Sequence, residues 1–163
     1  TKSKKLKASH PDLAAIFIDY LGLITTNAKL GEVSRANEVG EISRSIKALA
    51  RELDLPIICL SQLSRANEKS ARQPILSDLR DSGSIEQDAD QVLFIHRDDY
   101  QKPEKQQEEA KNNENADSDG AYDVSKPTKI IIAKNRNGKT GTIELQFLMN
   151  IGKFIEVGGE NKQ

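Results

Sequence analysis

A strand–helix–strand pattern in the N-terminal part of the chain most constrains the fold. Residues 13–18 and 57–60 are short, continuous apolar runs, which are typical of strands buried on both faces of a sheet. Between them, apolar side chains recur at helical spacing over residues 36–53, with Ser34 as the candidate N-cap and Pro56 after the last turn. Two strands joined by such a helix should be parallel neighbours in one sheet.

The remainder of the chain predicts further strands and one short helix. Residues 142–148 alternate between apolar and polar side chains, as expected of an antiparallel strand with one buried face. Residues 75–80 are a candidate short helix. The other predicted strands cover residues 91–96, 128–133 and 153–157. The expected fold class is therefore α/β, with parallel strands and a C-terminal antiparallel extension.

One segment stands apart in composition. Residues 98–127 consist mainly of Gln, Glu, Lys, Asn and Asp, and they cannot bury enough apolar surface to offset the entropy of ordering them. We therefore predict a disordered insertion at 98–127 within a single domain that spans residues 1–163. This insertion is either a contact surface for a partner or a tolerated surface loop.

Composition and charge exclude several kinds of protein. The formal net charge is −1, so any contact with nucleic acid must come from local basic clusters. Cys59 is the only cysteine, which excludes an intramolecular disulfide and predicts a buried, reduced thiol in a cytoplasmic protein. His10 and His96 have no partners at metal-ligand spacing. No apolar run approaches the length of a membrane span.

Two polar residues follow the predicted parallel strands. Asp19 comes directly after the first apolar run, and Gln62 follows the second. Ligands collect at the carboxyl ends of parallel strands, where an Asp can hold the Mg²⁺ of a nucleotide and an amide can contact its terminal phosphate. The alternatives are an aspartate that caps a loop and an ordinary loop glutamine.

Four segments together resemble the C-terminal RecA-like ATPase domain of DnaB-type replicative helicases. The most specific is Ser77-Asp78-Leu79-Arg80-Asp81-Ser82-Gly83-Ser84-Ile85-Glu86-Gln87-Asp88-Ala89-Asp90, and the others cover residues 16–23, 60–65 and 132–138. The resemblance implies a RecA-like P-loop NTPase sheet in a homo-hexameric ring that uses ATP and Mg²⁺ to move along single-stranded DNA. It also implies primase and a helicase loader as partners.

The resemblance assigns nucleotide contacts to four residues. Asp19 matches the Walker B aspartate, which holds Mg²⁺, and Gln62 matches the glutamine that faces the γ-phosphate. Lys134 and Arg136 match the basic pair that reaches the nucleotide of the neighbouring subunit, with Arg136 as an arginine finger. Without the resemblance, Arg136 is equally a solvent-exposed arginine in a hairpin turn. Asn135 and Lys139 replace the usual Gln and Pro of this turn, and neither change removes a required charge.

The resemblance also assigns a DNA-contacting loop to Arg80, Asp81 and Gly83. A motor that steps over any sequence should contact phosphates rather than bases. Arg80 offers a charged donor, and glycine lets backbone N–H groups approach closely. Asp81 cannot attract a phosphate by charge, so we expect it to orient the loop; it replaces the usual Glu of the family. The alternative is a solvated turn with Arg–Asp pairs.

The phosphate loop that such an ATPase needs, GxxxxGK[ST], has one false match. Gly138-Lys139-Thr140 fails because the first glycine would be Ala133, and because a strand pattern follows instead of a helix. In the family, the phosphate loop and the catalytic glutamate precede the Walker B strand, and residues 1–12 contain neither. We therefore expect that the chain begins partway through a motor domain. Alone it should lack ATPase activity and be marginally stable or associate.

Two other functions remain open. The chain could be a RecA-like module that binds DNA or helicase subunits without hydrolysing ATP. A recombinase-like ATPase that forms filaments would share the strand-end aspartate, but the segment around Arg80 argues against it.

Overall fold

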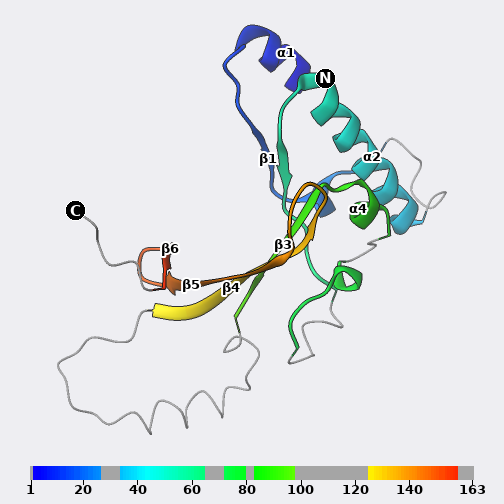
Figure 1. The fold of residues 1–163 in the computed structure, drawn as a ribbon. Coiled ribbons are helices and arrows are strands. Elements are labelled where there is room, and N and C mark those ends of the chain that lie inside the picture. The colour runs from blue at the N-terminus through cyan, green and yellow to red at the C-terminus, as the bar shows by residue number, and fades with distance from the viewer. Residues whose placement is uncertain (1, 27–33, 65–71, 80–82, 98–124, 158–163) are drawn as a thin grey trace, which may run out of the picture. The chain divides into compact units, whose positions relative to one another are not determined.

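The computed structural model describes residues 2–26, 34–64, 72–79, 83–97 and 125–157 (Figure 1). The chain divides into two compact units. The first comprises residues 1–64 and 76–89, and the second comprises residues 65–75 and 90–163. The first unit contains a parallel pair of strands, and the second contains an antiparallel sheet.

The predicted strand–helix–strand unit is confirmed in the first unit. β1 (Ile16–Ile18) and β2 (Ile57–Cys59) pair in parallel, and α2 (Arg35–Leu53) connects them. The Ser34 hydroxyl accepts a hydrogen bond from the Asn37 N–H at 3.4 Å, so the predicted N-cap is confirmed. The helix ends at Asp54, which adopts a left-handed conformation (φ 49°), two residues before Pro56.

The core of this unit lies on one side of the strand pair. Leu21, in the 3₁₀ turn η1 (Leu21–Leu23), is buried together with Val39 and Ile42 of α2. Cys59 of β2 packs against this cluster as a free, partly buried thiol, and burial raises its pKa above the usual value. The thiol is thus less buried than predicted.

The opposite face of the strand pair corrects one expectation. Phe17 and Ile58 are register partners and share that face, and they are 75% and 40% exposed. The two strands are therefore not buried on both faces within this chain. Their continuous apolar runs reflect side chains that alternate between a covered and an exposed face.

Shorter elements complete the first unit. α1 (Lys2–Ser9) is joined to the last turn of α2 by a Lys4–Glu52 ion pair of 2.6 Å. The predicted helix at residues 75–80 is only a 3₁₀ turn, η2 (Leu76–Asp78). α4 (Gly83–Asp88) packs against α2; at six residues it is too short to show a helical period in the sequence.

The second unit is a four-stranded antiparallel sheet in the order β3-β4-β5-β6. The four predicted strands are confirmed. They are β3 (Gln91–His96), β4 (Ser125–Asn135), β5 (Gly141–Leu148) and β6 (Lys153–Glu156). In β5, Ile143 is exposed and residues 145–148 are all partly buried, so the predicted single buried face is not observed and burial instead increases toward the end of the strand.

The start of β4 corrects the boundary of the predicted insertion. Residues 125–127 belong to the strand and pair with residues 146–148 of β5, while residues 98–124 lie outside the described part of the chain. The register between β3 and β4 ends at Lys129. Among the described residues, Pro127 therefore has a strand partner only in β5, and a residue without an N–H is tolerated where a strand is paired on one side.

The helices of the described ranges include none that combines the length and apolar character of a membrane span.

Gly40 of α2 allows the close approach of α4, and this contact can be tested. A Cβ at position 40 would lie 2.6 Å from the Ser84 Oγ and 3.3 Å from the Ser84 Cβ. We expect Gly40→Val to destabilise this packing by about 1–3 kcal/mol and to accelerate hydrogen exchange in residues 83–89. Ala48→Val, at an exposed position of the same helix, controls for the helix propensity of valine. Equal exchange in the two variants would show that the close contact is unimportant.

Candidate functional site

The chain segments that follow β1 and β2 run side by side. The Leu60 N–H donates to the Ile18 carbonyl at 2.9 Å, and the Leu21 N–H donates to the Leu60 carbonyl at 2.9 Å. Residues 19–21 and 60–62 therefore form one edge, which we call the strand-end edge. Both Asp19 and Gln62 lie on it, so the predicted proximity of these two segments is present in the fold.

The strand-end edge contains an open hollow. Tyr20, Leu60, Ser61 and Gln62 line it, and its volume is about 300 Å³. Asp19 is exposed beside Tyr20, to which it is joined by a cis peptide bond. Gln62 is also exposed, so its amide can donate to or accept from a bound group.

The Asp19 carboxylate suits a metal ion whose other ligands are water and substrate phosphates. No three His, Cys, Asp or Glu side chains in the described residues gather as a metal site. Mg²⁺ commonly binds through one or two carboxylates, with water and substrate phosphates filling its other positions. The exposed Asp19 carboxylate suits that arrangement and not a cage built entirely of protein groups.

The strand-end edge continues toward the predicted DNA loop. Leu63, next to Gln62, forms an antiparallel bridge with Leu79, and the Ser64 N–H donates to the Asp78 carbonyl at 2.8 Å. Arg80 and Asp81 follow Leu79 but lie outside the described residues. Gly83 begins α4 and is exposed, and a Cβ there would meet no atom of the described residues within 4 Å. The described part of the chain therefore leaves open space beside the backbone at position 83.

The second unit carries the predicted basic pair near the end of β4. Lys134 lies opposite Val92 of β3 and is partly buried. The Arg136 N–H donates to the Asp90 carbonyl at 2.8 Å, and the Arg136 guanidinium pairs with the Asp90 carboxylate at 3.1 Å. Sequence analysis missed this role of Asp90, because the two residues are 46 positions apart.

The Arg136–Asp90 ion pair is open to solvent. The side chains are 45% and 49% exposed, and exposed pairs are worth about 1 kcal/mol or less. A phosphate group can therefore compete with the Asp90 carboxylate for this guanidinium at little cost.

The turn after Arg136 explains the false phosphate-loop match. A Cβ at Gly138 would lie 2.6 Å from the Asn135 Nδ2, which donates to the Lys139 carbonyl at 3.2 Å. The glycine makes room for this amide, and the turn leads into β5 rather than into a helix. Gly138 therefore serves a hairpin, as the sequence indicated.

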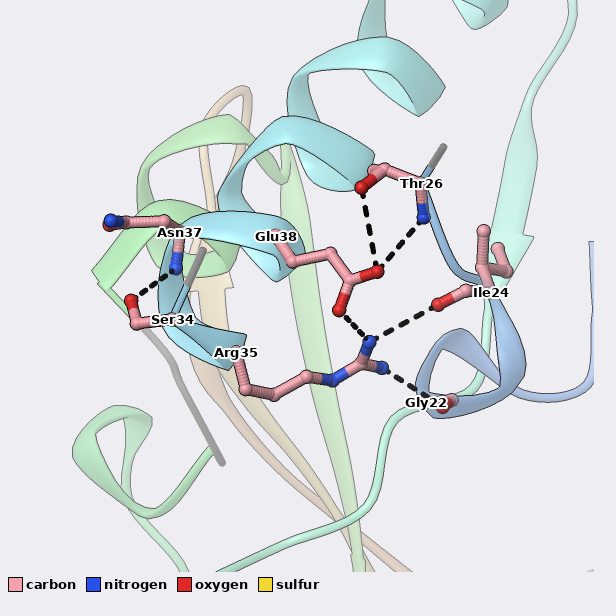
Figure 2. Close-up of polar contacts among 7 residues, drawn as sticks. All are labelled: Gly22, Ile24, Thr26, Ser34, Arg35, Asn37 and Glu38. Atoms are coloured by element: carbon pink, nitrogen blue, oxygen red, sulfur yellow. Dashed lines mark hydrogen bonds and ion pairs between the residues drawn. The ribbon is translucent and has the colours of Figure 1, made fainter. Parts of the chain in front are cut away.

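A polar network joins α2 to residues 22–26, which follow Asp19 in the chain (Figure 2). Sequence analysis also missed this network. Arg35 donates to the Gly22 carbonyl at 2.9 Å and to the Ile24 carbonyl at 3.3 Å. It also pairs with Glu38, whose carboxylate accepts the Thr26 N–H at 2.9 Å. The pKa of Glu38 lies below its usual value, chiefly because of the hydrogen bond from the Thr26 N–H and secondly because of the hydrogen bond from the Arg35 side chain.

The lowered pKa of Glu38 predicts a pH-dependent contribution to stability. An acid whose pKa is depressed by folding stabilises the fold above its unfolded pKa, and this stabilisation is lost as the pH falls through the folded pKa. We expect the difference in melting temperature between the full-length protein and its Glu38→Gln variant to be constant from pH 7 to about 5 and to shrink below about 4.5. Glu41→Gln removes an exposed carboxylate from the same helix and is the control. A difference that stays constant down to pH 3 would contradict the shift.

Comparisons with known proteins identify the family. A family model described as the DnaB-like helicase C terminal domain matches residues 1–156. The replicative DNA helicase DnaB of Geobacillus stearothermophilus is 46% identical over 157 residues, which are 96% of this chain and 30% of that protein. The replicative DNA helicase DnaB of Rickettsia typhi is 44% identical over 158 residues, which are 94% of this chain and 31% of that protein. This chain therefore spans about a third of the length of these relatives.

Two solved structures share the fold. A DnaB-like replicative helicase, described with its interactions with primase, has a TM-score of 0.73 and 38% identity, covering 96% of this chain and 34% of that one. The ATPase domain of G40P also has a TM-score of 0.73, with 36% identity, covering 96% of this chain and 49% of that one. They confirm the predicted RecA-like α/β fold, and together with the family model they show that this chain belongs to the DnaB-like helicase C-terminal domain family.

Proposed function

We propose that this chain is the C-terminal part of the motor domain of a hexameric replicative DNA helicase, which acts in the cytoplasm. The helicase couples ATP hydrolysis to movement along single-stranded DNA and to unwinding of the duplex. The observation that carries the proposal is the strand-end edge, where Asp19 and Gln62 follow neighbouring parallel strands beside an open hollow. Nucleotides bind at this edge in parallel α/β sheets.

Asp19 and Gln62 would divide the nucleotide contacts. The exposed Asp19 carboxylate would hold the Mg²⁺ that accompanies ATP and neutralises charge developing on the transferred phosphoryl group. The Gln62 amide would hydrogen-bond the γ-phosphate or the attacking water. Because Gln62 is followed directly by the Leu63–Leu79 bridge, a shift at the phosphate would be passed on to the segment that leads into Arg80.

Lys134 and Arg136 would act on the nucleotide of the neighbouring subunit. The Arg136 guanidinium would exchange the Asp90 carboxylate for a phosphate oxygen. Because the Arg136–Asp90 pair is exposed to solvent, breaking it would cost little free energy. Because an arginine supplied in trans completes the site, hydrolysis would depend on assembly of the ring. Such a residue is worth roughly 10³–10⁵ in rate.

Arg80, Asp81 and Gly83 would contact the DNA backbone in the ring channel. Phosphate contacts carry no base information, which suits a motor that crosses any sequence. Single-stranded DNA binding should therefore weaken with added salt. We further propose primase as a partner, since one solved relative is described with its interactions with primase. The family resemblance implies a helicase loader as a second partner.

A module that binds DNA or helicase subunits without hydrolysis is the alternative. The feature that favours it is the sequence, which contains no complete GxxxxGK[ST] pattern. In the helicase proposal, the full-length protein supplies this loop.

Asp19→Asn tests the role of the strand-end edge. In the full-length hexamer, we expect this change to reduce ATP turnover on the order of 100-fold, because a metal's charge stabilisation is worth several kcal/mol. Asp12→Asn removes another exposed carboxylate shortly before β1 and should leave turnover unchanged. Turnover that survives Asp19→Asn would contradict the proposed role of Asp19, whereas a parent hexamer without turnover would favour the non-hydrolysing module.

Mixed rings test whether Arg136 acts in trans. Arg136→Ala should lower hydrolysis on the order of 10³-fold while sparing nucleotide binding. Arg136→Ala and Asp19→Asn subunits mixed in one ring should regain measurable turnover, because an intact Asp19 can meet an intact Arg136 of its neighbour. Rings that mix Arg136→Ala with the double variant are the control. If the two mixtures are equally inactive, Arg136 serves its own subunit.

A further inference from the structure

We propose that Arg35 and Glu38 are positioning residues for the strand-end edge, so that hydrolysis depends on them although neither belongs to that edge. This inference rests on the proposed function. It follows from three sets of contacts, all within the first unit: those of Arg35, of Glu38 and of the turn η1.

Arg35 fixes the turn that follows Asp19 and Tyr20. Its guanidinium donates to the carbonyls of Gly22 and Ile24, which lie on either side of Leu23. Figure 2 shows the side chain reaching from the first turn of α2 to both carbonyls. A planar guanidinium can serve two carbonyls and a carboxylate at once, because it has five N–H donors in a fixed geometry.

Glu38 holds the guanidinium in place. One carboxylate oxygen pairs with Arg35, and the other accepts the N–H of Thr26 at 2.9 Å. The pair is partly shielded from water, with Glu38 and Arg35 side chains 18% and 35% exposed. Glu38 therefore orients Arg35 and also fastens the chain two residues beyond Ile24.

The turn η1 transmits this anchoring to both nucleotide-contacting residues. Its first residue, Leu21, is buried in the core and donates to the Leu60 carbonyl. Asp19 lies two residues before Leu21, and Gln62 lies two residues after Leu60. A shift of the turn would therefore displace Asp19 and Gln62 together through very short lengths of backbone.

The kinetic consequence is specific. A misplacement of about 1 Å at reacting groups can cost on the order of 100-fold in rate. Asp19 and Gln62 are proposed to act where charge develops on the terminal phosphate, so their displacement should affect the transition state more than the bound ATP. Loss of an interaction made only in the transition state lowers kcat and leaves KM little changed.

Arg35→Lys in the full-length hexamer is the decisive variant. Lysine keeps the charge and the pairing with Glu38, but one ammonium group cannot bridge the two carbonyls in the geometry of a guanidinium. We expect kcat for ATP to fall about 10-fold, with KM changed by less than about 3-fold. Arg51→Lys, at an exposed site in the last turn of the same helix, is the matched control and should change neither constant.

A second variant separates positioning from general stability. Glu38→Gln retains an oxygen that can accept the Thr26 N–H but removes the charge that orients Arg35. It should show the same fall in kcat at a temperature at which the hexamer remains fully assembled. If kcat is unchanged in both variants, or falls only in proportion to the loss of assembled hexamer, the inference is wrong.

The parent hexamer distinguishes failure of this inference from failure of the proposed function. If the parent hexamer has ATPase activity that depends on Asp19 and the Arg35 variants retain it, this inference alone fails. If the parent hexamer has no such activity, the proposed function fails and this inference fails with it.

Discussion

The parallel pairing of β1 with β2 sets the positions of Asp19 and Gln62, the two residues of the first unit that we propose to contact a nucleotide. The ladder extends past the strands themselves, since the Leu60 N–H reaches the Ile18 carbonyl and the Leu21 N–H reaches the Leu60 carbonyl. Because these hydrogen bonds join backbone to backbone, they hold the strand-end edge in place without using the side chains of Asp19 and Gln62. Asp19 and Gln62 remain exposed while the chain that carries them is fixed.

Arg35 and Arg136 of this nearly neutral chain differ in how their charges are held. Arg35 is shielded by Glu38 and by two backbone carbonyls, so its charge serves the fold. Arg136 pairs with Asp90 in a solvent-exposed contact that water and salt weaken. The net charge of −1 hides this difference, because it sums charges that are committed to the fold with charges that can exchange partners.

The sequence predicted those features that a local pattern encodes. The spacing of apolar residues located α2 and all four strands of the antiparallel sheet, and the hydroxyl of Ser34 located the start of α2. The position of Asp19 and Gln62 after two apolar runs predicted their common edge, because parallel strands end on the same side of a sheet. The segment around Arg80 carried the family resemblance, which no period or propensity would supply.

The sequence could not predict contacts made between distant backbone and side-chain groups. Arg35 and Glu38 stand three residues apart, so their pairing is suggested by helical spacing. Their other partners are the carbonyls of Gly22 and Ile24 and the N–H of Thr26. Such backbone groups are common to nearly all residue types, and only proline lacks the N–H. The partner of Arg136 is 46 residues away. The exposure of Phe17 and Ile58 could not be predicted for a related reason. A continuous apolar run does not indicate which face of the strand is covered by other parts of the chain. In a network built largely on backbone groups, the sequence therefore identifies only the charged members, Arg35 and Glu38. Their contacts with the segment after β1 are recognised only from the fold.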